Sequence, residues 1–219
     1  MPSTRRSITL LAGTTLIAPS FARLATANAT ANNATPNMGT ANSPFGERAI
    51  GSPDAKVKAI EYFSLTCTHC AYFATVTMTK VKPDLIDTNK LQIVFKDFPL
   101  DQVALMAAQV ARSLPPAQYY PFVEALFASQ NDWAFKPGVN YVEAIYKYAA
   151  LAGMSRADYD AALRNTAVQK FILDGQQEAE KMYNINSTPS FVINGKLYVG
   201  AMEYPDFAAL IGRLAQGQG

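Results

Sequence analysis

The alternation of apolar and polar residues divides this chain into short strand-like runs and longer helix-like segments. Each strand-like run is rich in β-branched or aromatic residues and is bounded by turn residues. The dipeptide Asn194-Gly195 between the last two runs predicts a β-hairpin, and residues 50–54 read as a turn before the first run. The predicted strands are residues 57–63, 91–95, 191–193 and 197–199.

Segments with apolar residues at helical spacing occupy much of the remaining chain. Asp101 and Ser155 are expected to cap two of these helices, and Asp158 completes a capping box with Ser155. Residues 131–138, which hold the only tryptophan, read as a loop. The predicted helices are residues 67–83, 102–113, 117–128, 141–151 and 166–183, a short helix after Ser155, and a last helix from Pro205 to about residue 214.

No convincing strand pattern occurs from Pro115-Pro116 to residue 165. This stretch predicts a helical insertion (115–165) within an α/β domain made of residues 45–114 and 166–219. Four aromatic residues near its start are expected to form a small core of the insertion: Tyr119, Tyr120, Phe122 and Phe127.

The first 29 residues have the three-part pattern of an export signal peptide. The pair Arg5-Arg6 is followed by the apolar stretch 8–18 and then by small residues, with an A-x-A-type cleavage site after Ala27 or Ala29. The apolar stretch is too short for a permanent membrane span. Because the twin arginine resembles a Tat signal only in part, Tat and Sec export both stay open. We therefore expect a periplasmic protein.

Residues 30–44 are rich in Ala, Asn, Thr, Gly and Pro and are predicted to be a flexible leader. They lack the strands or heptads of a dimerisation module, which favours a monomer. Removal of residues 1–29 takes away three of the 19 lysines and arginines and none of the 17 acidic residues, so the remaining chain has a formal charge of −1. The composition therefore offers no basic stripe for nucleic acid.

Both cysteines and the only histidine lie in Cys67-Thr68-His69-Cys70, between the first predicted strand and a helix. A Cys-x-x-Cys pair in this position is the usual form of a dithiol redox site. The two sulfurs would lie about one helical turn apart, near enough to form a disulfide. Unpaired N–H groups and the helix dipole favour a thiolate at Cys67, which is therefore predicted to have a lowered pKa and to be the nucleophile.

Three other side chains have predicted roles at this site. Cys70 would be the resolving thiol that attacks a mixed disulfide on Cys67. His69, if protonated or donating a hydrogen bond, would stabilise the thiolate. Glu61 either faces solvent or is a buried carboxylate that accepts or relays the Cys70 proton, with its pKa raised by desolvation. Lys96 is a possible partner of Glu61, but no partner is assigned.

The order of these elements resembles the thioredoxin fold: a strand, a Cys-x-x-Cys helix, a helical stretch, Thr188-Pro189, a hairpin and a closing helix. The cysteine motif, the preceding residues 61–66 and the insertion resemble its DsbA-like branch, over about residues 51–214. The resemblance implies an α/β thioredoxin fold with an inserted helical subdomain. It also implies a cis peptide bond at Thr188-Pro189 that faces the cysteines and pairs with an extended substrate, and a buried acid at Glu61. Thr68 departs from the proline frequent in this branch, so the oxidising strength is not implied.

The sequence thus predicts a thiol-disulfide oxidoreductase that introduces disulfides into unfolded or reduced exported proteins and is reoxidised by a DsbB-like membrane partner. It predicts no cofactor and no metal. A disulfide isomerase or reductase is the nearest alternative. Soft-metal binding by Cys67, His69 and Cys70 is a weaker one, because three ligands within four residues make a poor closed site. A purely structural disulfide would close a tiny loop and stabilise little.

Overall fold

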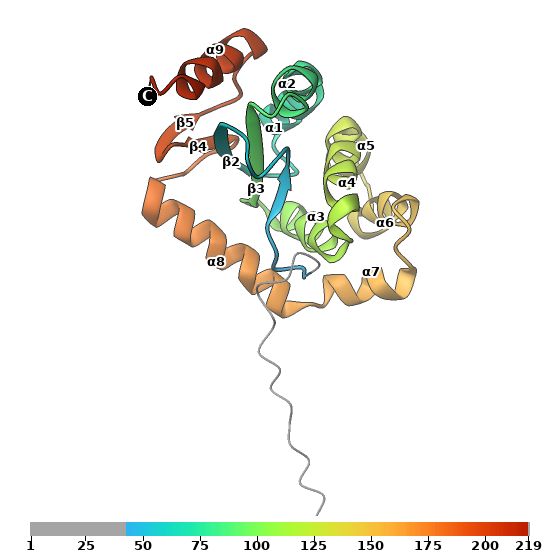
Figure 1. The fold of residues 1–219 in the computed structure, drawn as a ribbon. Coiled ribbons are helices and arrows are strands. Elements are labelled where there is room, and N and C mark those ends of the chain that lie inside the picture. Colours follow the sequence, from blue (N-terminus) through green and yellow to red (C-terminus); the bar gives the residue numbers. More distant parts are fainter. Residues whose placement is uncertain (1–42, 219) are drawn as a thin grey trace, which may run out of the picture. The chain divides into compact units, whose positions relative to one another are not determined.

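A five-stranded sheet with the strand order β1-β3-β2-β4-β5 forms the centre of the structure (Figure 1). The structure is a computed structural model, and it describes residues 43–218. Strands β2 and β3 are parallel and the other neighbours are antiparallel. The four predicted strands are all present, and both Asn194 and Gly195 have positive φ, as a two-residue hairpin turn requires. The strands are β1 (Arg48–Ile50), β2 (Val57–Phe63), β3 (Leu91–Asp97), β4 (Ser190–Ile193) and β5 (Lys196–Val199).

Strand β1 is an addition that the sequence pattern did not predict. It has three residues, with register Arg48↔Phe95 and Ile50↔Ile93, and it covers the outer edge of β3. Residue 50, for which the sequence predicts a turn, is therefore the end of a strand. So short a run has no alternation of its own to recognise, and it is extended because the open edge of β3 supplies its hydrogen-bond partners.

The predicted helices are confirmed with small changes at their ends. One prediction was wrong: Trp133 does not lie in a loop but ends a four-residue helix, where it is fully buried and donates from Nε1 to the Leu126 carbonyl at 2.7 Å. The Ser155 cap is present, since its Oγ accepts from the Asp158 N–H at 3.1 Å. The helices are α3 (Gln102–Ser113), α4 (Pro116–Ala128), α5 (Gln130–Trp133), α6 (Tyr141–Leu151), α7 (Arg156–Leu163), α8 (Thr166–Tyr183) and α9 (Tyr204–Ala215).

The helix that follows the cysteines runs past its predicted end at Pro83. Helices α1 (Thr68–Tyr72) and α2 (Met78–Val81) alternate with the π-helical segments η1 (Phe73–Thr77) and η2 (Lys82–Ile86). Pro83 lies in the first turn of η2. A wider π-helical turn relieves the clash between a proline ring and the carbonyl four residues before it, so the chain stays helical to Ile86.

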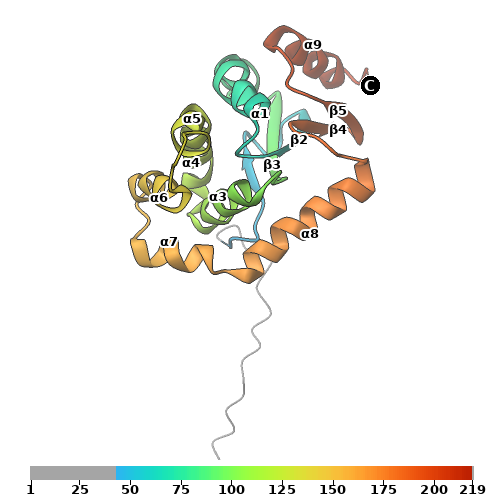
Figure 2. The same cartoon turned by 180° about the vertical axis from the view of Figure 1, so that it is seen from behind.

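The two faces of the sheet are covered by different helices. Helices α1, α2 and α9 pack on the face that carries Phe191, where the Phe73 ring centroid lies 4.8 Å from that of Phe191 and 5.4 Å from that of Phe207. Helix α8 packs on the face that carries Tyr62 and Val192. In Figure 1 and Figure 2, α8 runs from the end of α7 to the β4–β5 hairpin.

The insertion, α4 to α7, shares its core with the sheet. The rings of Phe63 and Phe127 lie 5.8 Å apart, and Tyr120 stacks on Phe95 at 5.4 Å. These aromatic residues are core residues, as predicted, but the core is not the insertion's own, because it is continuous with that of the sheet. The aromatic residues of α4 join the insertion to β2 and β3, the strands that lead to and flank the cysteine motif.

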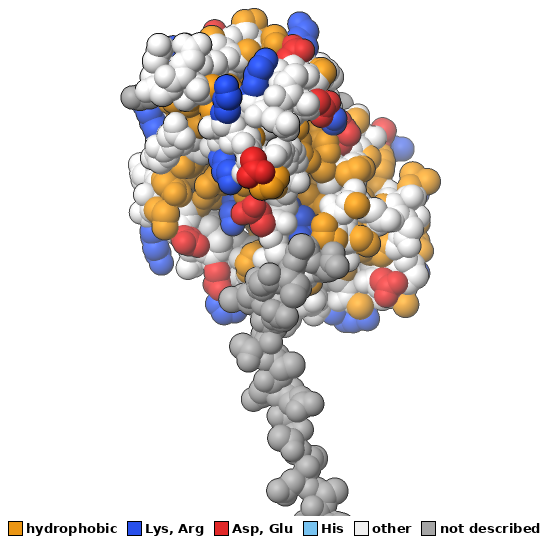
Figure 3. Space-filling model, viewed as in Figure 1, with side chains coloured by type: hydrophobic (Ala, Val, Ile, Leu, Met, Phe, Trp, Pro, Cys, Tyr) orange, Lys and Arg blue, Asp and Glu red, His pale blue; other side chains and the backbone are white. Residues whose placement is uncertain are grey.

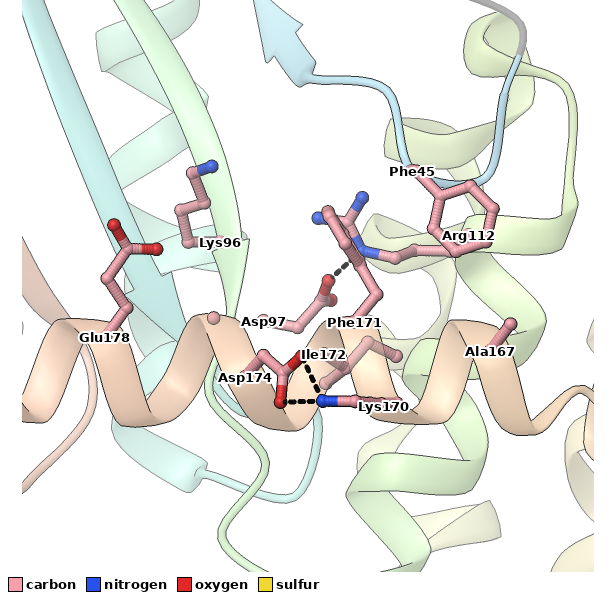
Figure 4. A pocket seen from close by; sticks show the side chains of 11 residues that line it. Phe45, Lys96, Asp97, Arg112, Ala167, Lys170, Phe171, Ile172, Asp174 and Glu178 are labelled. Atoms are coloured by element: carbon pink, nitrogen blue, oxygen red, sulfur yellow. Dashed lines mark hydrogen bonds and ion pairs between the residues drawn. The ribbon is translucent and has the colours of Figure 1, made fainter. Parts of the chain in front are cut away.

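A buried ion pair anchors the chain where it enters the domain. Arg112 of α3 donates from Nε to Asp97 at the end of β3, and both side chains are only 3% exposed (Figure 4). Arg112 also donates to the carbonyl of Pro44 at 3.3 Å, and Arg48 donates to that of Ser43 at 3.2 Å. Two residues of the predicted leader, Ser43 and Pro44, are thus hydrogen-bonded to the domain.

The surface shows no segregation of charge on the face drawn in Figure 3. Lysine and arginine side chains are interspersed there with aspartates and glutamates, and hydrophobic side chains show between them. Within residues 43–218, no helix combines the length and apolar character that a membrane-spanning helix needs.

Candidate active site

Cys67 occupies the N-cap of α1, one residue before the helix, and its sulfur acts as the capping group. The Cys70 N–H donates to Cys67 Sγ at 3.2 Å, a bond that a serine or aspartate oxygen makes at many other helices. Both thiols are free. The Cys67 side chain is 7% exposed and that of Cys70 is fully buried. Cys67 is therefore the thiol nearer to solvent, as the sequence predicts.

The surroundings of the two thiols move their pKa values in opposite directions. A hydrogen bond from the Cys70 thiol is the main cause that lowers the pKa of Cys67 from 9.0 to about 6, and the backbone N–H groups of Cys70 and His69 add to it against the opposing effect of burial. Burial, reinforced by the neighbouring Cys67 sulfur, raises the pKa of Cys70 well above its ordinary value. At neutral pH the site thus holds one thiolate and one thiol.

Glu61 lies in a central strand and is only 3% exposed, so the buried alternative is the one observed. Burial first, and then the negative charge of Cys67, raise its pKa from 4.5 to about 8. A cavity of about 10 Å³, room for one water molecule, lies beside it and is also lined by Tyr120 and Glu124. Lys96 pairs in register with Tyr62 rather than Glu61 and so points to the opposite face of the sheet.

The raised pKa of Glu61 predicts a pH-dependent gain in stability for Glu61→Gln. The folded protein binds this proton more tightly than the unfolded chain, so the contribution of Glu61 to stability is lost as pH rises from about 4.5 to 8. Glutamine cannot ionise, and the variant should be more stable by about 3 kcal/mol at pH 7 and no more stable below about pH 4.5. Urea unfolding of reduced protein across this range is the measurement. A gain in free energy of unfolding that stays constant with pH would contradict this prediction.

His69 has an exposed side chain, and among residues 43–218 its imidazole makes no hydrogen bond to the site. Its contribution in this structure comes from its backbone N–H, which helps to lower the pKa of Cys67. The role of the imidazole stays a prediction.

The loop before β4 faces Cys67. In its protonated form the Cys67 thiol donates to the Thr188 carbonyl at 3.3 Å, and the peptide bond between Thr188 and Pro189 is cis, as the resemblance implied. The other side of the loop is fixed to the hairpin, where the Gly200 N–H donates to the Pro189 carbonyl at 2.8 Å. Residues 121 positions apart in the chain thus meet at the sulfur.

Two further contacts at the site were not predicted from the sequence. Gln130 of α5 donates from Nε2 to the carbonyls of Leu65 and Cys67. Thr66 donates to the N-cap residue Asp101 at 2.6 Å, which joins the loop before Cys67 to α3. Asp101 was recognisable as a cap, but nothing in its local sequence indicates a second partner, and Gln130 carries no local signal. Among the described residues, no group of three or more His, Cys, Asp and Glu side chains is placed to hold a metal ion.

Comparison with known proteins agrees with this geometry. The model of a family described as Thioredoxin matches residues 44–213. The crystal structure of Wolbachia pipientis alpha-DsbA1 superposes with a TM-score of 0.73 and 27% identity, covering 78% of this chain and 92% of that one. This chain is a DsbA-like member of the thioredoxin superfamily.

Two other relatives of this DsbA-like protein differ in the activity that their names state. A Rickettsia conorii protein named as a protein-disulfide oxidoreductase is 29% identical over 150 residues, 68% of this chain and 53% of that one. The structure of a protein-disulfide isomerase from Novosphingobium aromaticivorans matches with a TM-score of 0.66 and 25% identity, covering 75% of this chain and 97% of that one. The chain spans about half the length of the curated relatives that it matches.

Proposed function

We propose that this DsbA-like protein is a periplasmic oxidase that transfers the Cys67–Cys70 disulfide to exported proteins. The observation that carries the proposal is the Cys67 sulfur, which caps α1 and has a pKa lowered to about 6. A thiolate that is stable at neutral pH favours the reduced dithiol, and this makes the disulfide a stronger oxidant. The export signal predicted at residues 1–29, which lies outside the described residues, fits a compartment in which disulfides persist.

The reaction takes two exchange steps. A substrate thiolate attacks Cys67 Sγ and forms a mixed disulfide, while the Cys67–Cys70 bond breaks and Cys70 leaves with the electron pair. A second substrate thiolate then attacks the substrate sulfur of the mixed disulfide, and Cys67 leaves as a thiolate. The substrate loses two electrons and the protein gains them. Because the pKa of Cys67 is about 6, the second leaving group needs no proton at neutral pH.

Glu61 is suited to supply the proton of the first step. With a pKa of about 8 it is largely neutral at pH 7, whereas the Cys70 thiolate is a strong base in its buried position. Transfer of the Glu61 proton to Cys70 gives the thiol, and the cavity beside Glu61 offers room for a water molecule that returns a proton. The exposed imidazole of His69, if protonated or donating a hydrogen bond, would stabilise the negative charge of the Cys67 thiolate.

The substrate would bind in an extended conformation against Thr188 and Pro189, whose backbone lies next to the nucleophile. A chain that pairs there brings its own cysteine to Cys67 with few side-chain requirements, which suits many unfolded or reduced exported proteins. A membrane partner resembling DsbB would accept the two electrons and restore the disulfide. Action as a monomer is part of the same proposal.

The reduction potential of the Cys67/Cys70 pair is the experiment that tests this proposal. Equilibration with glutathione buffers should give a value well above about −270 mV, the level of thioredoxin. A value near or below that level would replace the oxidase with a reductase. The name of one matched structure, a protein-disulfide isomerase, favours isomerase activity as a second candidate function. In that case the reduced protein should repair scrambled disulfides.

A further inference from the structure

Gln130 connects the helical insertion to the backbone on both sides of the nucleophile. It is the first residue of α5 and it is buried, with 6% exposed. Its Nε2 donates to the Leu65 carbonyl at 2.8 Å and to the Cys67 carbonyl at 3.0 Å. Both N–H bonds of one amide are therefore used on two carbonyls of the active-site loop.

These two carbonyls determine how the chain enters α1. The Cys67 carbonyl also accepts the Ala71 N–H at 3.1 Å, the first hydrogen bond of the helix. The Leu65 carbonyl belongs to the peptide that leads into Thr66. Fixing both peptides fixes the Cα–Cβ direction of Cys67, and hence the distance from its sulfur to the N–H of Cys70, 3.2 Å.

We propose that Gln130 is a positioning residue: it holds the Cys67 sulfur over the first-turn N–H groups, so that the helical insertion sets the exchange equilibrium of the dithiol. This rests on the proposed function, in which the stability of the Cys67 thiolate makes the disulfide oxidising. A displaced sulfur would lose hydrogen bonds that stabilise the charged form more than the thiol.

A second buried glutamine provides a matched control. Gln109 of α3 is 3% exposed and donates from Nε2 to the carbonyls of Ala162, Leu163 and Asn165 at 3.3 to 3.5 Å. It makes the same kind of amide-to-backbone contact with the insertion, but its partners lie far along the chain from the cysteine motif. Loss of either amide should lower stability, but only loss of the Gln130 amide should alter the pKa of Cys67 and the exchange equilibrium of the dithiol.

The test compares the full chain with Gln130→Met and Gln109→Met. Ultraviolet titration of the thiolate in reduced protein gives the pKa of Cys67, and glutathione buffers give the exchange equilibrium. Gln130→Met should raise the pKa of Cys67 and shift the equilibrium about three- to tenfold toward the disulfide, the effect of one hydrogen bond. Gln109→Met should leave both unchanged. Should the methionine variant fail to fold, Gln130→Leu also removes both donors, with a side chain of similar volume and no charge.

The outcomes separate this inference from the proposed function. If the folded Gln130 variants titrate and equilibrate like the parent, or change only as Gln109→Met does, Gln130 is a packing residue and the inference is wrong. If the parent itself has no thiol that titrates near pH 6, the oxidase proposal fails first. A parent with an acidic thiol and Gln130 variants with a less acidic one would support both.

Discussion

Cys67→Ser is expected to reduce thiol-disulfide exchange to the uncatalysed rate. The serine hydroxyl can take over the capping bond from the Cys70 N–H, so the fold should persist, but it cannot form a disulfide. Cys70 cannot substitute, because it is fully buried and its pKa is raised well above the ordinary value. Oxidation of a reduced peptide by the disulfide form of the parent, and its absence in the variant, is the measurement.

Cys70→Ser should also lose turnover, but unlike Cys67→Ser it should accumulate mixed disulfides. Cys67 remains the sulfur nearer to solvent, and its thiolate can attack a disulfide of a substrate protein. Without a resolving thiol it should then hold the substrate as a mixed disulfide that survives non-reducing electrophoresis. The double variant Cys67→Ser/Cys70→Ser is the control and should hold none. If Cys70→Ser captures no more protein than the double variant does, Cys67 is not the nucleophile.

Asp97→Asn is expected to cause the largest loss of stability among these variants. Arg112 and Arg48 are both buried near this carboxylate, and Asp97 accepts from Arg112 and from the Tyr119 hydroxyl, which lies 3.4 Å away. Asparagine keeps the shape but leaves the arginines without a counter-charge. Removing one partner of a buried pair costs about 3–5 kcal/mol, which should lower the melting midpoint by roughly 10 °C.

An exposed ion pair, which also joins an aspartate to a basic side chain, is the control for this variant. Asp87 pairs with Lys82 at 2.9 Å, and the two side chains are 52% and 51% exposed. Asp87→Asn should therefore cost less than about 1 kcal/mol. Urea unfolding of both variants in the same redox state measures the loss in free energy of unfolding. Equal losses would show that the buried Asp97 pair stabilises the fold no more than the exposed pair does.

The local elements of the fold were predictable because their signals are local. Strand β2 has its apolar composition, the hairpin has Asn194-Gly195, and α3 has the Asp101 cap, each within a few residues of the element that it determines. The Cys-x-x-Cys spacing likewise contains its own geometry, since one helical turn separates the sulfurs. These features specified the thioredoxin-like order and the identity of the two thiols.

Other features were decided only when distant segments packed together. Strand β1 is extended because β3 has a free edge, and Trp133 is helical because it packs inside the insertion. Glu61 could be read as exposed or buried until the aromatic residues of α4 covered its face of the sheet. The aromatic residues of the insertion likewise belong to a core, as predicted, but packing made it one core with the sheet.

The acidity of the site belongs to this second class. The sequence by itself determined that Cys67 precedes a helix and that Cys70 lies one turn later. The tertiary structure decided that Cys70 is buried, that the Thr188 carbonyl meets the Cys67 sulfur, and that Gln130 donates to the loop that ends at Cys67. Hydrogen bonds between residues more than 60 positions apart leave no periodic pattern in a sequence, and burial depends on every element that covers a group. For this reason the sequence indicates the two sulfurs for which we propose a redox role, while the fold sets how acidic they are.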